Sequence, residues 1–177
     1  MITSKIIILS GKAIPVRGND IDTDEIIPAR FMRTITFDTL GQFAFYDVRF
    51  NADGSEKKHS FNEEKYADAN ILLVNKNFGC GSSREHAIWA LRGSGIKAVI
   101  ADSFARIFFR NCINNGFLAI ELKDASKKIK NKDKLEINLE KGKIKDLTNK
   151  KEFKFTPFPK FALDIINAGG LLNYIKK

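Results

Sequence analysis

The stretch that decides the fold of this chain is residues 77–86, which read Asn-Phe-Gly-Cys-Gly-Ser-Ser-Arg-Glu-His. Before it lies the apolar run of residues 71–74, which is too short for a helix and rich in residues that favour strands. After it, residues 87–91 have the pattern of a helix. We therefore predict a strand, a glycine-containing loop and a helix, in that order.

The loop carries signals for a helix start and for an anion site. Ser82 is followed three residues later by Glu85, the spacing of a capping box, which predicts that the helix begins near Ser82. A helix start carries unpaired N–H groups and a partial positive charge, and Gly79 and Gly81 leave the backbone open to a ligand. Arg84 adds a cation at this positive end, so it needs an anionic partner, either Glu85 or a ligand. The alternative is that Ser82 only caps the helix and Arg84 is a solvated surface residue.

Three other loop motifs do not fit these residues. A Walker phosphate loop needs Lys followed by Ser or Thr, and no such pair follows Gly81. A dinucleotide-binding loop needs a third glycine where Arg84 stands. A nucleophile elbow needs a serine between two glycines at two-residue spacing, which is absent from this stretch.

Three separated motifs resemble a known family. Residues 77–87 are preceded by residues 19–28, Asn-Asp-Ile-Asp-Thr-Asp-Glu-Ile-Ile-Pro, and followed by residues 101–108, Ala-Asp-Ser-Phe-Ala-Arg-Ile-Phe, and by the Asn-Asn-Gly of 114–116. Together they are similar to the small subunits of the 3-isopropylmalate dehydratases, the detached swivelling domain of the aconitase family, over most of residues 5–122. The resemblance implies an α/β fold, a three-layer β/β/α domain of aconitase type, with an additional β-hairpin region near the C-terminus.

The resemblance also implies an activity that needs a partner. Members of the family isomerise 2-isopropylmalate and 3-isopropylmalate by dehydration and rehydration in leucine biosynthesis. Their large subunit holds a 4Fe-4S cluster that acts as Lewis acid on the leaving hydroxyl, so we expect no cofactor on this chain and no activity without the large subunit. Carried over by position, Ser82 is the base that takes a proton from carbon. Ser83 and Arg84 bind a substrate carboxylate, and Arg33 and Thr34 contact the variable end of the substrate.

Arg33 and Thr34 leave the substrate open. In the family, an Arg-Thr pair at this place goes with a carboxylate on the variable end, because an arginine facing an isopropyl group lacks an ion partner. The pair favours homoaconitate or a substituted malate such as 2,3-dimethylmalate, whereas residues 37–50 resemble the longer loop of the isopropylmalate enzymes. The simpler alternative for Arg33 is a surface cation bonded to a nearby aspartate. A non-catalytic anion-binding module is the alternative from another class.

The acidic residues Asp20, Asp22 and Asp24 do not form a calcium loop. Such a loop needs a glycine and an acid at the positions that Glu25 and Phe31 occupy. We expect the aspartates to form turns and cap helices, since Asp bonds its own nearby backbone. The resemblance offers the alternative that they orient arginines of the active site.

The rest of the chain alternates strands and helices, which predicts parallel strands in an α/β domain. No linker or repeat divides residues 1–177, so we predict one domain. The elements expected outside the central loop are a buried first strand in 6–9, a strand in 96–101, a helix in 104–114, a strand in 117–120, a hairpin of 135–139 with 144–147, a third strand in 153–155 and a helix in 159–168.

Composition limits the partners. The 177 residues carry a formal net charge of +9, and lysines crowd residues 123–160. These lysines alternate with acids on strands whose other face is apolar, so we interpret them as a solvated face and expect no nucleic-acid binding. No run is long enough to cross a bilayer and no cleavage pattern follows the first apolar run. We therefore expect no membrane association and a cytoplasmic location.

The remaining titratable groups are given no catalytic role. Cys80 and Cys112 have no metal-ligand spacing, and a single thiol cannot hold a cluster that needs about four ligands. We interpret both as reduced thiols. His59 is expected to be exposed in a polar stretch, and His86 to be a structural hydrogen-bonding residue.

Overall fold

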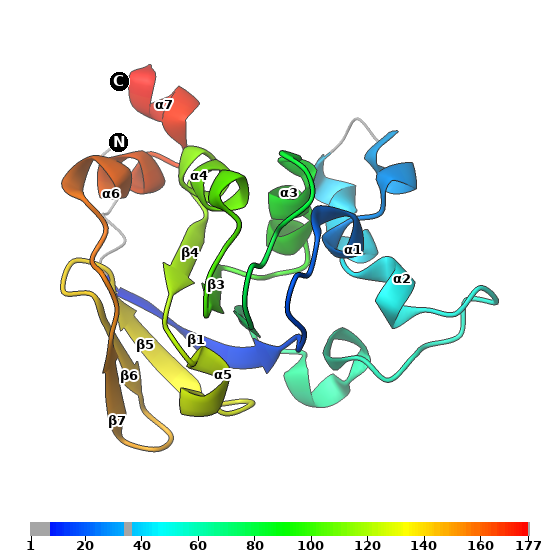
Figure 1. Ribbon diagram of the computed structural model, residues 1–177, viewed down its shortest axis with the longest axis horizontal. Helices are drawn as coiled ribbons and strands as arrows, with labels where there is room; N and C mark the ends of the chain where they lie inside the picture. Colours follow the sequence, from blue (N-terminus) through cyan, green and yellow to red (C-terminus); the bar gives the residue numbers. More distant parts are fainter. Residues whose placement is uncertain (1–7, 34–36, 177) are drawn as a thin grey trace.

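One curled sheet organises the molecule. The structure is a computed structural model that describes residues 8–33 and 37–176. Among them, seven strands form a sheet of order β4-β3-β2-β1-β5-β6-β7 (Figure 1). Strands β1 to β4 run parallel, and β5 to β7 continue from β1 in antiparallel pairing. Their bounds are β1 Ile8–Pro15, β2 Ile71–Val74, β3 Ala98–Ala101, β4 Leu118–Glu121, β5 Lys134–Asn138, β6 Lys143–Asp146 and β7 Lys151–Lys154.

The parallel strands are apolar because both of their faces are covered. Every residue of β2 and β3 is buried, and continuous apolar runs are what doubly covered parallel strands require. Side chains alternate along a strand, so Leu72 and Val74 join one hydrophobic core while Ile71 and Leu73 join the other. The predicted strands β2, β3 and β4 are confirmed, with ends that differ by at most two residues.

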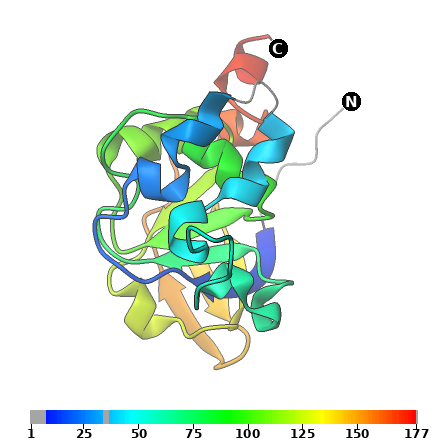
Figure 2. The ribbon, with the colours of Figure 1, turned by 90° about the vertical axis from the view of Figure 1, so that its right-hand side faces the viewer.

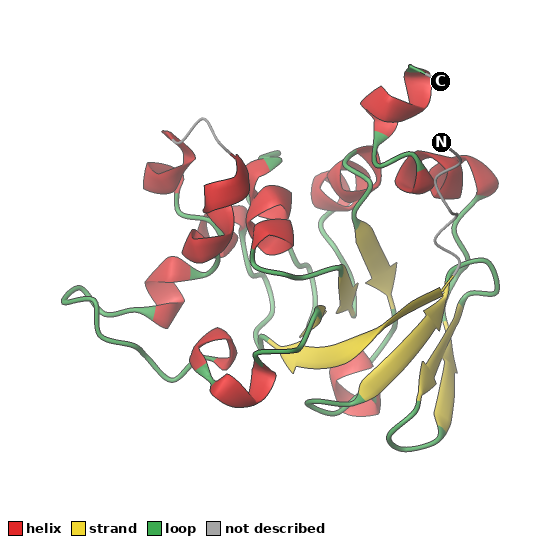
Figure 3. Ribbon diagram, turned by 180° about the vertical axis from the view of Figure 1, so that it is seen from behind, coloured by secondary structure: helices red, strands yellow, loops and turns green. Residues whose placement is uncertain are grey.

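The two cores give the fold its three layers. On one face, α3 (His86–Gly93) and α4 (Arg106–Asn114) pack against the parallel strands. On the other face, the sheet curls so that β5 and β6 pack Leu135, Ile137 and Ile144 against it. Figure 3 shows the β5–β7 hairpins on the side of the molecule away from α1 and α2. The predicted β/β/α domain and its C-terminal hairpin are therefore confirmed.

Short helices fill the long connection between β1 and β2. They are α1 (Thr23–Ile26), η1 (Ala29–Arg33), η2 (Phe37–Phe43), α2 (Tyr46–Arg49), η3 (Ser60–Asn62) and η4 (Glu64–Tyr66). Figure 2 shows them stacked across one end of the molecule. η2 lies directly on α3, where a Cβ added to Gly41 would fall 2.0 Å from the carbonyl carbon of Gly93. Only glycine allows these two backbones to approach so closely.

Two predictions about element bounds need correction. The buried first strand was predicted in residues 6–9, of which residues 6 and 7 lie outside the described part. Ile8 is 53% exposed and therefore not buried as predicted. Burial begins at Ala13, where β1 pairs with β2. The helix predicted from residue 104 begins instead at Arg106, because Phe104 is extended and bridges to Phe78.

The predicted hairpin, third strand and helix of residues 159–168 are confirmed, and two short helices in 125–128 and 171–175 were not predicted. The third strand of the hairpin region is β7, two residues earlier than expected at its start. The last helices are α5 (Ala125–Lys128), α6 (Lys160–Asn167) and α7 (Leu171–Ile175), and Gly169 and Gly170 separate α6 from α7. None of the helices in the described ranges combines the length and the apolar character that crossing a bilayer requires.

Candidate active site

The motifs at residues 19–28 and 77–87 come together at the carboxyl ends of β1 and β2. The Gly79 N–H donates to the carbonyl of Ile21 at 2.8 Å, and the Thr23 N–H donates to the carbonyl of Cys80 at 2.9 Å. Asp22 and Cys80 form an isolated parallel bridge. Because loops that leave neighbouring parallel strands meet at one edge of the sheet, this is where α/β proteins place their ligands. The adjacent loops form the candidate site.

Ser82 does not cap the helix, so the capping-box prediction is wrong. α3 begins at His86, and Glu85 at its N-cap makes no side-chain capping bond. Ser82 instead bonds across the two loops: its Oγ lies 2.8 Å from Thr23 Oγ1, and its N–H donates to the same oxygen at 3.3 Å. The loop segment before α3 is therefore held by α1 rather than continued as helix.

Thr23 was missed by the sequence reasoning. Its side chain is 1% exposed, and it lies between Asp22 and Asp24 in the acidic loop. The available signal was its place in the same motif as Asp22 and Asp24, although nothing local points its hydroxyl at Ser82. A second tether reaches the loop from α4, where Asn111 Nδ2 donates to the carbonyl of Ser83 at 3.0 Å.

Arg84 has an anionic partner, which is not Glu85 but one of the loop aspartates that the resemblance places beside arginines. Its guanidinium forms an ion pair with Asp24 on α1. Both side chains are partly exposed, at 34% and 57%, and such a pair contributes only about 0–1 kcal/mol to stability. The contact ties the Arg84 side chain to α1, the helix that also carries Thr23. Asp22 caps α1, as expected of these aspartates, because its carboxylate accepts from the Glu25 N–H at 2.7 Å.

The two glycines of the loop have distinct reasons to be glycine. Gly79 has φ +78°, and an added Cβ would lie 2.2 Å from Cγ of the buried Phe108. Gly81 has φ +93°, and its added Cβ would lie 3.3 Å from Asp22 Cβ and 3.7 Å from Thr23 Oγ1. Positive φ is costly for other residues. Gly79 thus seats the loop on α4, and Gly81 lets it approach α1.

Of the two residues predicted for the variable end of the substrate, only Arg33 lies in the described part, and no hydrogen bond or ion pair joins it to the described residues of this site. Thr34 lies outside the described residues. Arg33 is exposed at the end of η1, and no hydrogen bond or ion pair links it to any residue in the described ranges. The nearby cation that does bond an aspartate is Arg30, whose guanidinium pairs with Asp47.

The two thiols are not activated. Burial, with Asp22 and Asp20 nearby, raises the pKa of Cys80, and its Sγ donates to the carbonyl of Asp20 at 3.2 Å. Burial raises the pKa of Cys112 strongly. In the part of the chain that the structure describes, no three His, Cys, Asp or Glu side chains are grouped so that they could hold a metal ion. These residues do not fit an iron–sulfur cluster, which takes about four ligands.

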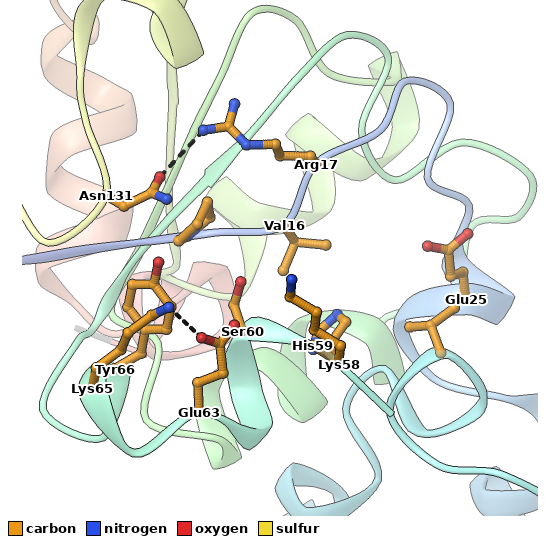
Figure 4. Close-up of a pocket in the computed structure, with 12 residues that line it drawn as sticks. Val16, Arg17, Glu25, Lys58, His59, Ser60, Glu63, Lys65, Tyr66 and Asn131 are labelled. Atoms are coloured by element: carbon orange, nitrogen blue, oxygen red, sulfur yellow. Dashed lines mark hydrogen bonds and ion pairs between the residues drawn. The ribbon is translucent and has the colours of Figure 1, made fainter. Parts of the chain in front are cut away.

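A separate cavity of about 500 Å³ lies beside α1 (Figure 4). Side chains from the end of β1, from α1 and from the η3–η4 turns line it, among them Arg17, Glu25 and His59. None of the predicted site residues lines it. His59 is half-buried there and not exposed as predicted: burial, and then the charge of Arg49, lowers its pKa to about 4.

Comparison with known proteins agrees with the motifs. The aconitase C-terminal domain family matches residues 3–125. The 3-isopropylmalate dehydratase small subunit of Endomicrobium trichonymphae is 46% identical over 170 residues, 96% of this chain and 98% of that protein. The isopropylmalate/citramalate isomerase small subunit of Methanocaldococcus jannaschii is 47% identical over 160 residues, covering 90% and 89% of the two chains. The crystal structure of a 3-isopropylmalate dehydratase from the same archaeon superposes with a TM-score of 0.78 at 37% identity, over 96% of this chain and 93% of that one. The chain therefore belongs to the aconitase C-terminal domain family, among the small subunits of the 3-isopropylmalate dehydratases.

Proposed function

We propose that this chain is the small subunit of a hydro-lyase that isomerises 2-isopropylmalate and 3-isopropylmalate in leucine biosynthesis. The observation that carries the proposal is the meeting of Ser82 and Arg84 with residues 22–24 at the carboxyl ends of β1 and β2. Relatives of nearly the same length carry this activity in their names. We further propose that the complex is cytoplasmic.

Ser82 is proposed as the base. During dehydration, the C–H bond of the substrate breaks, its electron pair enters the new C=C bond, and hydroxide leaves the neighbouring carbon. Ser82 Oγ takes the proton and returns it during rehydration. Arg84, oriented by Asp24, is placed to bind a substrate carboxylate with its planar fork, and Ser83 binds beside it. An arginine at the carboxylate also makes the adjacent C–H more acidic, because it neutralises charge there.

Negative charge on Ser82 Oγ is not stabilised by the helix start that the sequence predicted at this residue. The field of a helix start falls off within the first turn, and α3 begins four residues after Ser82. The groups in contact with Ser82 must therefore supply the support. We place the iron–sulfur cluster on the large subunit, since the described residues of this chain offer no set of ligands for it.

The test is the Ser82→Ala variant in complex with the large subunit, assayed anaerobically by absorbance of the unsaturated product. We expect turnover to fall by about 100-fold to 10,000-fold, the usual contribution of a positioned base. Gel filtration should show an unchanged complex. The matched control is Ser55→Ala, because Ser55 is an exposed serine in the turn of residues 51–55. Turnover of the Ser82→Ala complex at the wild-type rate would refute the assignment.

A second candidate substrate class is favoured by Arg33. This exposed arginine has no partner among the described residues and is available for a carboxylate on the variable end. The same assay should compare 3-isopropylmalate, homoaconitate and 2,3-dimethylmalate for wild type and Arg33→Val. A loss confined to homoaconitate assigns Arg33 to the variable end, and inactivity on every substrate with a competent large subunit supports an anion-binding module instead.

A further inference from the structure

The contact between Thr23 and Ser82 joins a buried hydroxyl to a partly exposed one. Among the described residues, Thr23 is one of three polar side chains counted as buried, with Asp133 and Asp146. Those two aspartates bond backbone N–H groups and the amide of Asn149, around the turns next to β5 and β6. Thr23 alone of the three faces a residue proposed for catalysis. Burying a hydroxyl without hydrogen-bond partners costs about 1–3 kcal/mol of folding free energy. The bonds that the Thr23 hydroxyl makes are therefore required, and they show which group it acts on.

The protons of this pair can be counted. A hydroxyl has one hydrogen to donate and two lone pairs that accept. Thr23 Oγ1 accepts the Ser82 N–H at 3.3 Å, and the 2.8 Å contact between the two oxygens needs one donor. When Ser82 acts as base, its oxygen has already given its proton to solvent and can only accept. In that state the hydrogen of the contact has to come from Thr23.

We propose that Thr23 is a positioning residue for the reaction: its hydroxyl donates to Ser82 Oγ in the basic state and aims that oxygen at the substrate C–H. This inference rests on the proposed function of Ser82. Thr23 keeps its own proton throughout, while the proton from the substrate carbon goes to Ser82 Oγ. A charged acceptor makes this bond stronger than a bond between neutral groups, so the contact stabilises the basic state more than the resting state.

The backbone keeps Thr23 in place independently of its hydroxyl. Its N–H donates to the carbonyl of Cys80 at 2.9 Å, and its carbonyl accepts from the Ile27 N–H at 3.0 Å. Gly81, whose added Cβ would lie 3.7 Å from Thr23 Oγ1, allows the close approach of the two loops. Replacing only the hydroxyl therefore leaves the tethers of α1 intact, and the role of the hydroxyl can be measured separately.

The experiment compares Thr23→Val, which removes the hydroxyl and keeps the shape, with Thr23→Ser, which keeps the hydroxyl. Each is assembled with the large subunit and assayed on 3-isopropylmalate. We expect Thr23→Val to lower kcat by about 100-fold, the size of effect known for removing one donor to an oxyanion, because less Ser82 is in its basic state; KM should change little. Its pH–rate profile should move to higher pH. Thr23→Ser should recover most of kcat. Thr148→Val is the matched control, because it removes the same kind of N–H···Oγ1 bond, 2.9 Å from Lys134, outside the site.

The outcomes separate this inference from the proposed function. A wild-type kcat for Thr23→Val, together with an inactive Ser82→Ala, overturns the role of Thr23 and leaves Ser82 as the base. An active Ser82→Ala overturns the assignment of Ser82 as the base, on which this inference rests, and a wild-type complex that is inactive with a competent large subunit overturns the proposed function itself. If Thr23→Val does not fold, Thr23→Ser and Thr23→Ala replace the pair, since both lack the methyl group and differ only in the hydroxyl. Equal kcat values for those two would also overturn the inference.

Discussion

Replacing Gly79 by alanine tests how the active loop is seated on α4. Gly79 has φ +78°, and an added Cβ would fall 2.2 Å from Cγ and 2.5 Å from Cδ2 of Phe108. Phe108 cannot easily move aside, because it is buried between Phe78 at 5.3 Å and Phe104 at 6.1 Å between ring centroids. The clash must therefore be relieved by displacing the loop or the aromatic cluster.

Two terms set the magnitude. The positive φ costs an alanine about 1–2 kcal/mol, and overpacking of a filled core costs about 1–3 kcal/mol. Gly79→Ala should thus lower the free energy of unfolding by about 2–5 kcal/mol. Gly54→Ala is the matched control, since Gly54 has φ +83° and nothing lies within 4 Å of its added Cβ. Gly54→Ala should lower the free energy of unfolding only by the cost of the positive φ, about 1–2 kcal/mol.

The measurement is urea unfolding of both variants and wild type, extrapolated linearly to water. The difference between the two variants isolates the contact with Phe108. A difference below about 0.5 kcal/mol, the usual error of additivity, would refute the claim that Phe108 fixes the loop. If the seating also positions Ser82, Gly79→Ala should lower the turnover of the complex, whereas Gly54→Ala should not.

Two further predictions concern charge. Asp24→Asn removes the partner of Arg84 and should raise KM about threefold to tenfold, equal to about 0.7–1.4 kcal/mol of binding; steady-state kinetics measure it, and an unchanged KM would contradict the orienting role. Asp47→Asn, which breaks the exposed pair with Arg30, is its control. His59 has its pKa lowered to about 4 from 6.5, chiefly by burial and then by Arg49, so the unfolded chain takes up this proton first as the pH falls. Stability should therefore decrease between pH 6.5 and 4, by about 1–2 kcal/mol after discounting for solvent screening. In urea unfolding at several pH values, His59→Asn should lack this loss, and an equal loss in the variant would contradict the assignment.

Much of the fold could be predicted because its signals are local. The strand at residues 71–74 and the hairpin of residues 135–147 follow from short runs of apolar residues and from alternation. The start of α3 could not be predicted in this way. Ser82 and Glu85 have the spacing of a capping box, but the Ser82 hydroxyl bonds Thr23, and residues 82–85 stay outside the helix. A tertiary hydrogen bond here overrides a local propensity.

The sequence by itself determined which side chains are candidates for the site, the glycines around them and the order of strand, loop and helix, because each depends on neighbours in the chain. Only the tertiary structure decided what those groups bond. The partners of Ser82 and Arg84 lie 59 and 60 residues earlier, on α1. They meet because parallel pairing of β1 and β2 places the loops after the two strands side by side. Such a pairing depends on burial of the whole sheet, which no local spacing encodes.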